Sequence, residues 1–305
     1  MDQPDRGALS HAAFFYRSQP EYAARIVAFI QAGLAAGEPA LVSVPGAQAC
    51  VIRDRLDDGP GEVVFTDMAE LGRNPARIIP EVRAFADKHP GQRVRFVGEP
   101  IWPGRSAAEI CEAARHEALI NLAFAQTPIT ILCPYDALGL AGSVLTGARR
   151  THQEPAATGA TVRTWRDNLP PECDRPLRPP PAGAEAIAYD TDLASVRRLV
   201  AGHARRAGLT AERTVDLVLA ASEIAANTIS HTTGSGVLQI WHSAGEIVCQ
   251  VHDQGEITDP LAGRVRHGPG DRGHGLWLVN QVCDLVELRT GRAGTTFRMH
   301  LGLTG

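Results

Sequence analysis

The sequence has no excess of basic residues and no long apolar run, and we expect no targeting segment at its start. Its 305 residues carry a formal net charge of −4. Because nucleic-acid phosphates are bound by surfaces rich in Lys and Arg, we expect no nucleic-acid partner. The first ten residues are polar, and no apolar run approaches the roughly 18 residues of a membrane span. We therefore expect a soluble cytoplasmic protein with no membrane partner.

Cysteine pairs at metal-ligand spacing are also missing. Most of the six cysteines lie in apolar runs, as Cys133 does after Ile131 and Leu132. A free cysteine behaves as a small apolar residue. We therefore expect all six to be reduced thiols in the core. They are Cys50, Cys111, Cys133, Cys173, Cys249 and Cys283.

A proline-rich stretch without apolar periodicity separates two parts of the chain, and it includes the triplet Pro179-Pro180-Pro181. Proline fixes φ and donates no backbone hydrogen bond, so this stretch is expected to be a semi-rigid connector. We predict a linker over residues 153–184, between a first domain over residues 1–152 and a second over residues 185–305. The chain is long enough for two domains that each bury a core.

The N-terminal part alternates helical and strand-like segments. Residues 22–35 repeat apolar side chains at helical spacing and stop before Gly37, a suitable helix terminator. The alternation predicts an α/β domain with a parallel sheet covered on both faces. The other expected helices are residues 76–88 and 107–125, and the expected strands are residues 40–44, 63–65, 94–97 and 129–132.

The C-terminal part has another pattern, with two helical segments followed mostly by strands. Ile247, Cys249 and Val251 alternate on one face, which is typical of a strand. We predict an α+β sandwich with helices on one face of a mixed sheet. The expected helices are residues 192–207, 211–230 and 276–284, and the expected strands are residues 186–189, 237–242, 247–252, 286–289 and 295–301.

Three polar residues recur every fourth position along the helix expected at residues 211–230. They are Glu223, Asn227 and, at its C-terminal edge, His231. Residues four apart share a helix face, so a carboxylate, an amide and an imidazole are presented to the same space. Taken singly, each is also compatible with a solvated helix face.

Three later segments are compatible with nucleotide contacts, although each taken alone is a weak signal and an Asp-x-Gly is usually just a turn. Asp253-Gln254-Gly255 ends a strand, where glycine permits close approach of a flat ligand. Asp271-Arg272-Gly273-His274-Gly275-Leu276 opens an apolar helix, and free N–H groups at a helix N-terminus bind phosphate. Gly294-Thr295-Thr296-Phe297 begins the last strand with hydroxyls that can bond the edge of a base.

The order of these four elements resembles that of the GHKL ATPases and, among them, the anti-sigma-factor serine kinases. The resemblance covers residues 185–305 and implies a domain that binds ATP with Mg²⁺. It implies that Asn227 binds Mg²⁺ and that Glu223 accepts the proton of the attacking hydroxyl. The cofactor site that it implies comprises Asn227, His231, Asp253, Gly255, Arg272, Gly273, His274, Gly275, Leu276 and Thr295.

Kinases of this branch hold a sigma factor inactive and phosphorylate a serine on a STAS-type anti-anti-sigma protein, commonly as homodimers. The resemblance therefore implies a protein serine/threonine kinase with these partners. One departure is Glu256, which replaces a glycine often found after Gly255. It favours an alternative, a catalytically inactive ATPase-fold module that sequesters a sigma factor or other partner under ligand control. A third hypothesis is a ligand-sensing protein whose two domains clamp on each other across the linker.

The N-terminal domain lacks the GxxxxGK[ST] loop that cradles phosphate. Several of its segments resemble MEDS sensory domains, which look like degenerate RecA-type folds and are thought to sense small molecules, including hydrocarbon derivatives. These segments are His11-x-x-x-Phe15-Tyr16, Asp67-Met68, residues 72–77, residues 98–102, residues 116–121 and Cys133-Pro134-Tyr135-Asp136.

Polar residues that end the expected N-terminal strands would gather at the carboxyl edge of the sheet, where ligands of α/β domains bind. They are Asp67, Glu99, Tyr135 and Asp136. Trp102 and Tyr16 are further candidates for lining a small-molecule pocket. A strand-end carboxylate also often caps the following helix, and Trp102 beside two prolines is equally compatible with loop packing.

Overall fold

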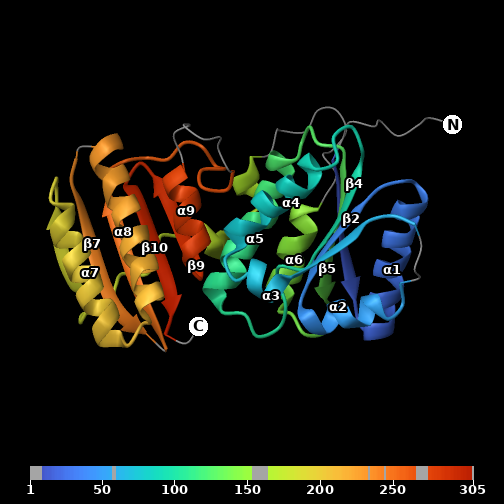
Figure 1. Ribbon diagram of the computed structural model, residues 1–305, viewed down its shortest axis with the longest axis horizontal. Coiled ribbons are helices and arrows are strands. Elements are labelled where there is room, and N and C mark those ends of the chain that lie inside the picture. The colour runs from blue at the N-terminus through green and yellow to red at the C-terminus, as the bar shows by residue number, and fades with distance from the viewer. Residues whose placement is uncertain are drawn as a thin grey trace. The chain divides into compact units, whose positions relative to one another are not determined.

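The computed structural model describes residues 9–56, 60–152, 164–232, 234–243, 245–265 and 274–303. The chain divides into two compact units, Met1–Asp174 and Arg175–Gly305, so the division falls inside the segment predicted as a linker. Figure 1 shows both units, which are described separately below. In the described ranges, no helix combines the length and apolar character needed to cross a membrane.

The first unit contains a five-stranded sheet in the order β1-β5-β4-β2-β3, and every bonded pair is parallel. The expected α/β class is therefore confirmed. One strand was not expected from the sequence: β1 pairs along its whole length with β5. Its alanines have weak strand propensity, and it is held by a partner over 100 positions away. The strands are β1 (Ser10–Tyr16), β2 (Ala40–Val44), β3 (Val63–Asp67), β4 (Val94–Gly98) and β5 (Ile129–Asp136).

Helices cover both faces of this sheet (Figure 1). On one face, α1 (Gln19–Ala35) and α2 (Gly46–Arg53) pack their apolar residues on β2. The opposite face carries α4 (Ile78–Asp87), α5 (Ala107–Ala123) and α6 (Gly142–Thr151), and a short helix, α3 (Met68–Leu71), follows β3. Ser18 begins α1, because its hydroxyl accepts the Glu21 N–H.

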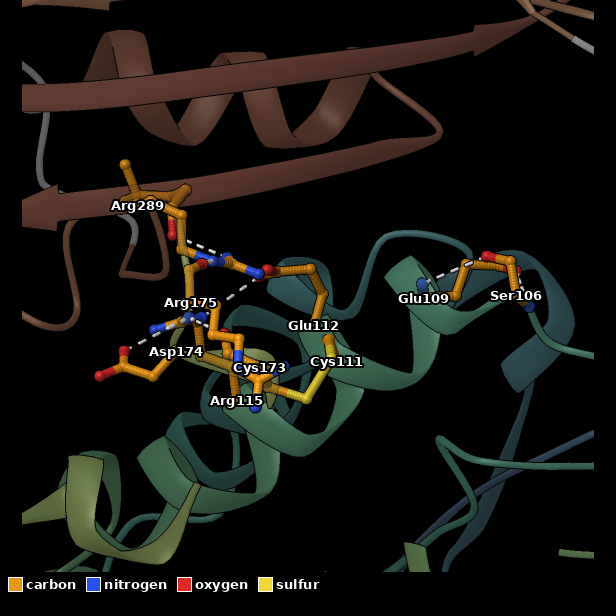
Figure 2. The surroundings of a disulfide bond; sticks show 10 residues. Ser106, Glu109, Cys111, Glu112, Arg115, Cys173, Asp174, Arg175 and Arg289 are labelled. Carbon is orange, nitrogen blue, oxygen red and sulfur yellow. Dashed lines mark hydrogen bonds and ion pairs between the residues drawn. A yellow bond between two sulfur atoms is a disulfide. The ribbon is translucent and has the colours of Figure 1, made fainter. Parts of the chain in front are cut away.

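A segment after α6 is fastened to α5 by a disulfide. Cys111 is bonded to Cys173, and Arg115 donates to the Cys173 carbonyl at 2.9 Å (Figure 2). The expectation that all six cysteines are reduced core thiols is wrong for this pair, because two short 3₁₀ turns, Trp165–Asn168 and Pro171–Cys173, fold back onto α5. Of the other four, Cys133, Cys249 and Cys283 are buried as expected, and Cys50 is exposed.

The second unit is an α+β sandwich, as expected. Its sheet has the order β6-β7-β8-β10-β9, and all four described pairings are antiparallel, so the expected mixed sheet is wrong in this respect. Figure 1 shows α7, α8 and α9 on one face. The elements are β6 (Glu185–Tyr189), α7 (Leu193–Ala207), α8 (Ala211–His231), β7 (Gly236–Ser243), β8 (Glu246–Asp253), α9 (His274–Val282), β9 (Leu285–Gly291) and β10 (Gly294–Gly302).

Helix α8 carries the predicted polar stripe. It begins at the cap residue Thr210, whose hydroxyl accepts the Arg213 N–H. Its buried residues, including Leu217 and Ile224, join the core formed with α7 and the sheet. Because that face is directed to the core, residues on the adjoining face are left partly accessible, and Glu223 and Asn227 are among them.

Candidate functional site

The start of α9 lies against the polar stripe of α8. Gly275 is the second residue of α9, and a Cβ built there would lie 2.6 Å from Glu223 Oε2 and 3.6 Å from Asn227 Nδ2. A contact of 2.6 Å is closer than real Cβ atoms approach, so a side chain at this position would displace the carboxylate. The structure thus brings Glu223, Asn227 and Gly275 together, whereas His231, the last residue of α8, is exposed.

Asp253 ends β8 and is held by two donors. Its Oδ2 accepts the Thr228 hydroxyl at 2.7 Å, and its Oδ1 accepts the Gly255 N–H at 2.8 Å. Tyr189 in turn donates to the Thr228 hydroxyl at 3.0 Å. Burial raises the pKa of Tyr189 to about 12, so this phenol stays a neutral donor. A carboxylate offers about four lone-pair sites, so Asp253 keeps acceptor capacity for a ligand.

Thr228 was not among the predicted site residues. It is 1% exposed and lies on the core side of α8, one position after Asn227. A hydroxyl on a face made otherwise mainly of Leu, Ile and Ala was the available signal, because buried polar atoms need partners. The role of Thr228 is to link Tyr189 to Asp253.

The beginning of β10 adjoins the Asp253 loop. Thr295 pairs with Asp253 across the sheet, and its hydroxyl donates to the Gly255 carbonyl at 2.8 Å. Gly294 has φ +107°, and a Cβ there would lie 2.1 Å from the Asp253 carbonyl, so glycine is required. Thr290 also joins this network, since its hydroxyl accepts the Ile257 N–H at 2.8 Å and lies 2.9 Å from that of Thr295.

The remaining predicted residues lie at or before the start of α9. Arg272 and Gly273 fall outside the described residues. His274 is the first residue of α9, and Leu276 packs partly buried against the core. Asn280, which sequence reasoning missed, donates to the carbonyls of Gly263 and Leu276 at 3.0 and 3.2 Å, and so ties Gly263, in the loop after β8, to α9.

In the first unit, three residues proposed for a ligand site instead cap a helix or turn or pack against a neighbouring side chain. Asp67 caps α3 by accepting the Ala69 N–H at 2.8 Å. Asp136 accepts the N–H groups of Leu138 and Gly139, each at 2.9 Å. Trp102 packs against the Arg105 guanidinium, which lies 4.4 Å from the centre of its ring. These contacts account for the three residues without a ligand.

Glu99 occupies a closed polar centre at the end of β4. Its carboxylate accepts the hydroxyls of Tyr16 and Tyr22 at 2.8 and 2.9 Å, and the residue is fully buried. Burial raises the pKa of Glu99 to about 7, against the lowering effect of the two hydrogen bonds. The hydroxyl of Tyr16 is therefore used in a hydrogen bond to this buried carboxyl group. Neither Tyr16 nor Trp102 lines the pocket described below.

The pocket lies on the α5 and α6 side of the first unit and has a volume of about 210 Å³. Its walls are mostly apolar, with Ile101, Ile110 and Val144 among them. Glu117 and Tyr135 add a carboxylate and a phenol, and the disulfide cysteines also contribute to the wall. Of the residues proposed from sequence for a sensory site, Tyr135 is therefore the one that lines this pocket.

Comparison with known proteins gives two family matches. Residues 10–153 match the MEDS family, described as the methanogen/methylotroph, DcmR sensory domain. Residues 188–301 match the histidine kinase-like ATPase domain family. No curated protein matches the chain. A crystal structure of the RsbU and RsbW domains of Rv1364c from Mycobacterium tuberculosis is similar at 20% identity and a TM-score of 0.32, over 40% of this chain and 33% of that chain.

Proposed function

Because the chain joins a MEDS domain to a histidine kinase-like ATPase domain, we propose that it is an anti-sigma-factor regulator that binds ATP with Mg²⁺ and phosphorylates a serine on an anti-anti-sigma partner. The match to the ATPase-domain family supports nucleotide binding. The anti-sigma activity is proposed from the resemblance of the sequence to the anti-sigma-factor serine kinases. The MEDS family supports a sensory role for the first unit, with a small molecule as its ligand.

One observation carries the proposal, the close approach of Gly275 to Glu223 and Asn227. It places the N-terminal end of a helix beside a carboxylate and an amide. Helix N-termini attract anions, and Mg²⁺ takes few protein oxygens beside nucleotide phosphates. The donor set and the glycine contacts therefore fit a nucleotide with its metal ion.

Each residue of this group has a proposed role. The amide oxygen of Asn227 binds Mg²⁺, while Glu223 accepts the proton of the partner's serine. General bases of this kind accelerate reactions by about 10²–10⁴-fold. ATP with Mg²⁺ supplies the phosphoryl group. Backbone groups near Gly273, Gly275 and Leu276 bind its phosphates, the guanidinium of Arg272 neutralises charge, and the imidazole of His274 adds a hydrogen bond.

The base is bound at the other end of the proposed site. Asp253 accepts a hydrogen bond from the adenine amino group, and its own donors hold it in place. Gly255 lies beside the base in this proposal, and the position requires glycine because a Cβ there would lie only 2.6 Å from the methyl carbon of Thr232. The Thr295 hydroxyl holds the Gly255 carbonyl and so positions this wall of the site.

Calorimetry with the full chain tests nucleotide binding. Wild-type protein should bind ATP in the presence of Mg²⁺, and Asn227→Ala should lower that affinity while leaving metal-free binding nearly unchanged. Glu212→Gln is the control, because Glu212 is exposed in the first turn of the same helix. Equal affinity of Asn227→Ala and wild type for ATP with Mg²⁺ would remove the metal assignment.

Phosphotransfer to a STAS-type protein tests the kinase activity. We expect Glu223→Gln to lower the rate about 10²–10⁴-fold, the range of general-base catalysis, with ATP affinity retained. Glu212→Gln should keep the wild-type rate. If Glu223→Gln transfers phosphate as fast as wild type, Glu223 is not the base.

A second candidate function is the inactive ATPase-fold module. The observation that favours it is the exposed carboxylate of Glu256, which directly follows Gly255 in the loop after β8. A stable sigma-factor complex without phosphotransfer, in wild type and in Glu256→Gly, would establish this function in place of the kinase. Recovery of phosphotransfer in Glu256→Gly would show that this carboxylate suppresses the reaction.

A further inference from the structure

A second cluster of polar side chains lies inside the first unit, away from the proposed nucleotide site. It comprises His11 of β1, Glu117 of α5, Cys133 of β5 and His152, which caps the end of α6. One nitrogen, oxygen or sulfur atom from each lies within 4.8 Å of those of the others. The side chains of His11, Glu117 and His152 are only 2–3% exposed, and Cys133 is 1% exposed.

The two imidazoles present the same nitrogen to this cluster. Nε2 of His11 lies 3.3 Å from Glu117 Oε2 and 3.3 Å from Cys133 Sγ. Nε2 of His152 lies 3.1 Å from the same Glu117 oxygen. Four potential metal ligands, two nitrogens, one sulfur and one oxygen, therefore converge from four separate elements.

The other ring nitrogens fix which nitrogen carries the proton. Nδ1 of His152 lies 2.7 Å from the Ala148 carbonyl, which can only accept. Nδ1 of His11 lies 3.0 Å from Asn121 Oδ1, while the Asn121 amide nitrogen donates to the Thr151 carbonyl at 2.9 Å. Asn121 thus turns its oxygen to His11. Both histidines donate from Nδ1, and in the neutral rings Nε2 is left as a lone pair.

Lone pairs that face a carboxylate at these distances need a proton or a metal ion between them. Within the described ranges, neither oxygen of Glu117 has a hydrogen bond of good geometry. A buried carboxylate without donors is costly unless a positive charge compensates it. Histidines that bind a metal through one nitrogen almost always donate the other to a carbonyl, carboxylate or water, and His11 and His152 both do so.

We propose that His11, Glu117, Cys133 and His152 form a binding site for a divalent transition-metal ion, with Zn²⁺ the best match. Imidazole nitrogen, thiolate sulfur and carboxylate oxygen are the ligands that zinc takes in tetrahedral sites, at about 2.0–2.3 Å. Such bonds place ligand atoms about 3.5 Å from one another, so the present cluster needs only a small contraction. Mg²⁺ and Ca²⁺ prefer oxygen ligands and do not match.

The pocket of the first unit gives an entry path to this site. Glu117 lines both the pocket and the cluster, and Tyr135 and Thr151 lie in the same wall. The Tyr135 ring also stands edge-on to His152, with centroids 5.7 Å apart. A metal ion bound there would sit at the wall of a mostly apolar pocket, reachable by a small ligand with one donor atom.

The test uses tag-free full-length protein, stripped with a chelator and titrated with Co²⁺ and then Zn²⁺. We expect one equivalent of Co²⁺ to give a tetrahedral visible spectrum with a thiolate-to-cobalt charge-transfer band, and Zn²⁺ to displace it. In Cys133→Ser the charge-transfer band should vanish. Cys50→Ser, which alters an exposed free thiol, should keep it.

Asn121→Ala measures the supporting contact without removing a ligand. Loss of such a partner typically lowers metal affinity about 10–100-fold, and we expect a loss in that range. Circular dichroism confirms folding of each variant. Failure of the wild-type chain to bind one equivalent of Co²⁺, or a cobalt spectrum without the thiolate band, would overturn the proposal even if Cys133→Ser did not fold.

Discussion

The two units place their polar groups in opposite ways. In the second unit, Glu223 and Asn227 lie on a partly accessible helix face, next to the start of another helix. In the first unit, Glu99 and Glu117 are enclosed, with relative exposures of 0% and 1%. A partly accessible group can exchange a large ligand, whereas an enclosed carboxylate must be neutralised by a proton, a donor or a metal ion.

This difference indicates separate kinds of chemistry in the two units. The second unit holds glycines at Gly255 and Gly275, where an added Cβ would collide with Thr232 or Glu223, and both belong to the proposed nucleotide site. The first unit instead has a small apolar pocket with one carboxylate in its wall. The first arrangement suits a nucleotide, and the second suits a small molecule or an ion. The predictions below test whether the units also respond separately.

The largest expected effect concerns the disulfide. Cys111 and Cys173 are 62 positions apart, and closing a loop of this length stabilises a fold by about 4 kcal/mol in the chain-entropy model. We expect Cys173→Ser to lower the free energy of unfolding of the first unit by about 2–4 kcal/mol. Peptide-resolved hydrogen exchange under mild denaturant should show the loss in residues 9–152 and leave the second unit unchanged.

Cys50→Ser is the matched control for this measurement, because its thiol is exposed and free. Reduction with dithiothreitol should reproduce the effect in wild type and add nothing in Cys173→Ser. Equal protection of the first unit in both states would show that the 3₁₀ turns are held to α5 by Arg115 and packing alone (Figure 2).

The next effect is a pH dependence that differs between the units. In the first, the folded pKa of Glu99 is about 7 against a usual value of 4.5, mainly because of burial. The folded state therefore holds this proton more tightly. Its contribution, about 3 kcal/mol, is fully present below pH 4.5 and is lost as the pH rises through 7. The two tyrosines face Glu99, and the negative charge of Asp136 also raises the pKa of Glu99 by repulsion.

In the second unit, His300 lies 3.1 Å from both Glu246 and Glu287. These carboxylates raise the pKa of His300 to about 9 against the opposing effect of burial, its largest influence. The stabilisation is therefore present below pH 6.5 and is lost as the pH rises through 9, again by about 3 kcal/mol at most. Hydrogen exchange between pH 5 and 9 should show the first unit weakening before the second.

Two variants test whether these pH dependences arise from Glu99 and His300. Glu99→Gln should flatten the response of the first unit between pH 4.5 and 7, and His300→Gln should flatten that of the second between pH 6.5 and 9. Each substitution should leave the other unit's profile as in wild type. A single shared profile for both units would contradict the assignment of these shifts to Glu99 and His300.

Much of the second unit could be predicted from sequence because its signals are local. Glu223 and Asn227 are one helical turn apart, and Asp253 and Gly255 directly follow an alternating strand. The antiparallel sheet could not be predicted, because β8 pairs with β10 across a loop, α9 and β9, which separate the two strands in the sequence. Thr228 was missed because a threonine on a buried helix face resembles an ordinary core residue.

In the first unit, the fold could be predicted from the sequence but the polar cluster and the disulfide could not. Its sheet follows from alternating patterns, yet His11, Glu117, Cys133 and His152 come from four elements spread over 142 positions. No spacing rule joins them, since β1 is brought to β5 only by sheet pairing. The disulfide was missed for the same reason, because it depends on two turns within the predicted linker that return to α5.

The smallest effect tests whether the proposed base-binding end of the second unit depends on a buried donor. Thr228→Val keeps the side-chain shape but removes the hydroxyl that donates to Asp253. A hydrogen bond to a charged group is worth about 1.5–3 kcal/mol, and part of this will be recovered by solvent, so we expect ATP affinity to fall about tenfold. Thr228→Ser retains the donor and should bind nearly as wild type. If both variants bind ATP as wild type does, Asp253 is oriented by the Gly255 N–H alone, and the hydroxyl network serves only the core.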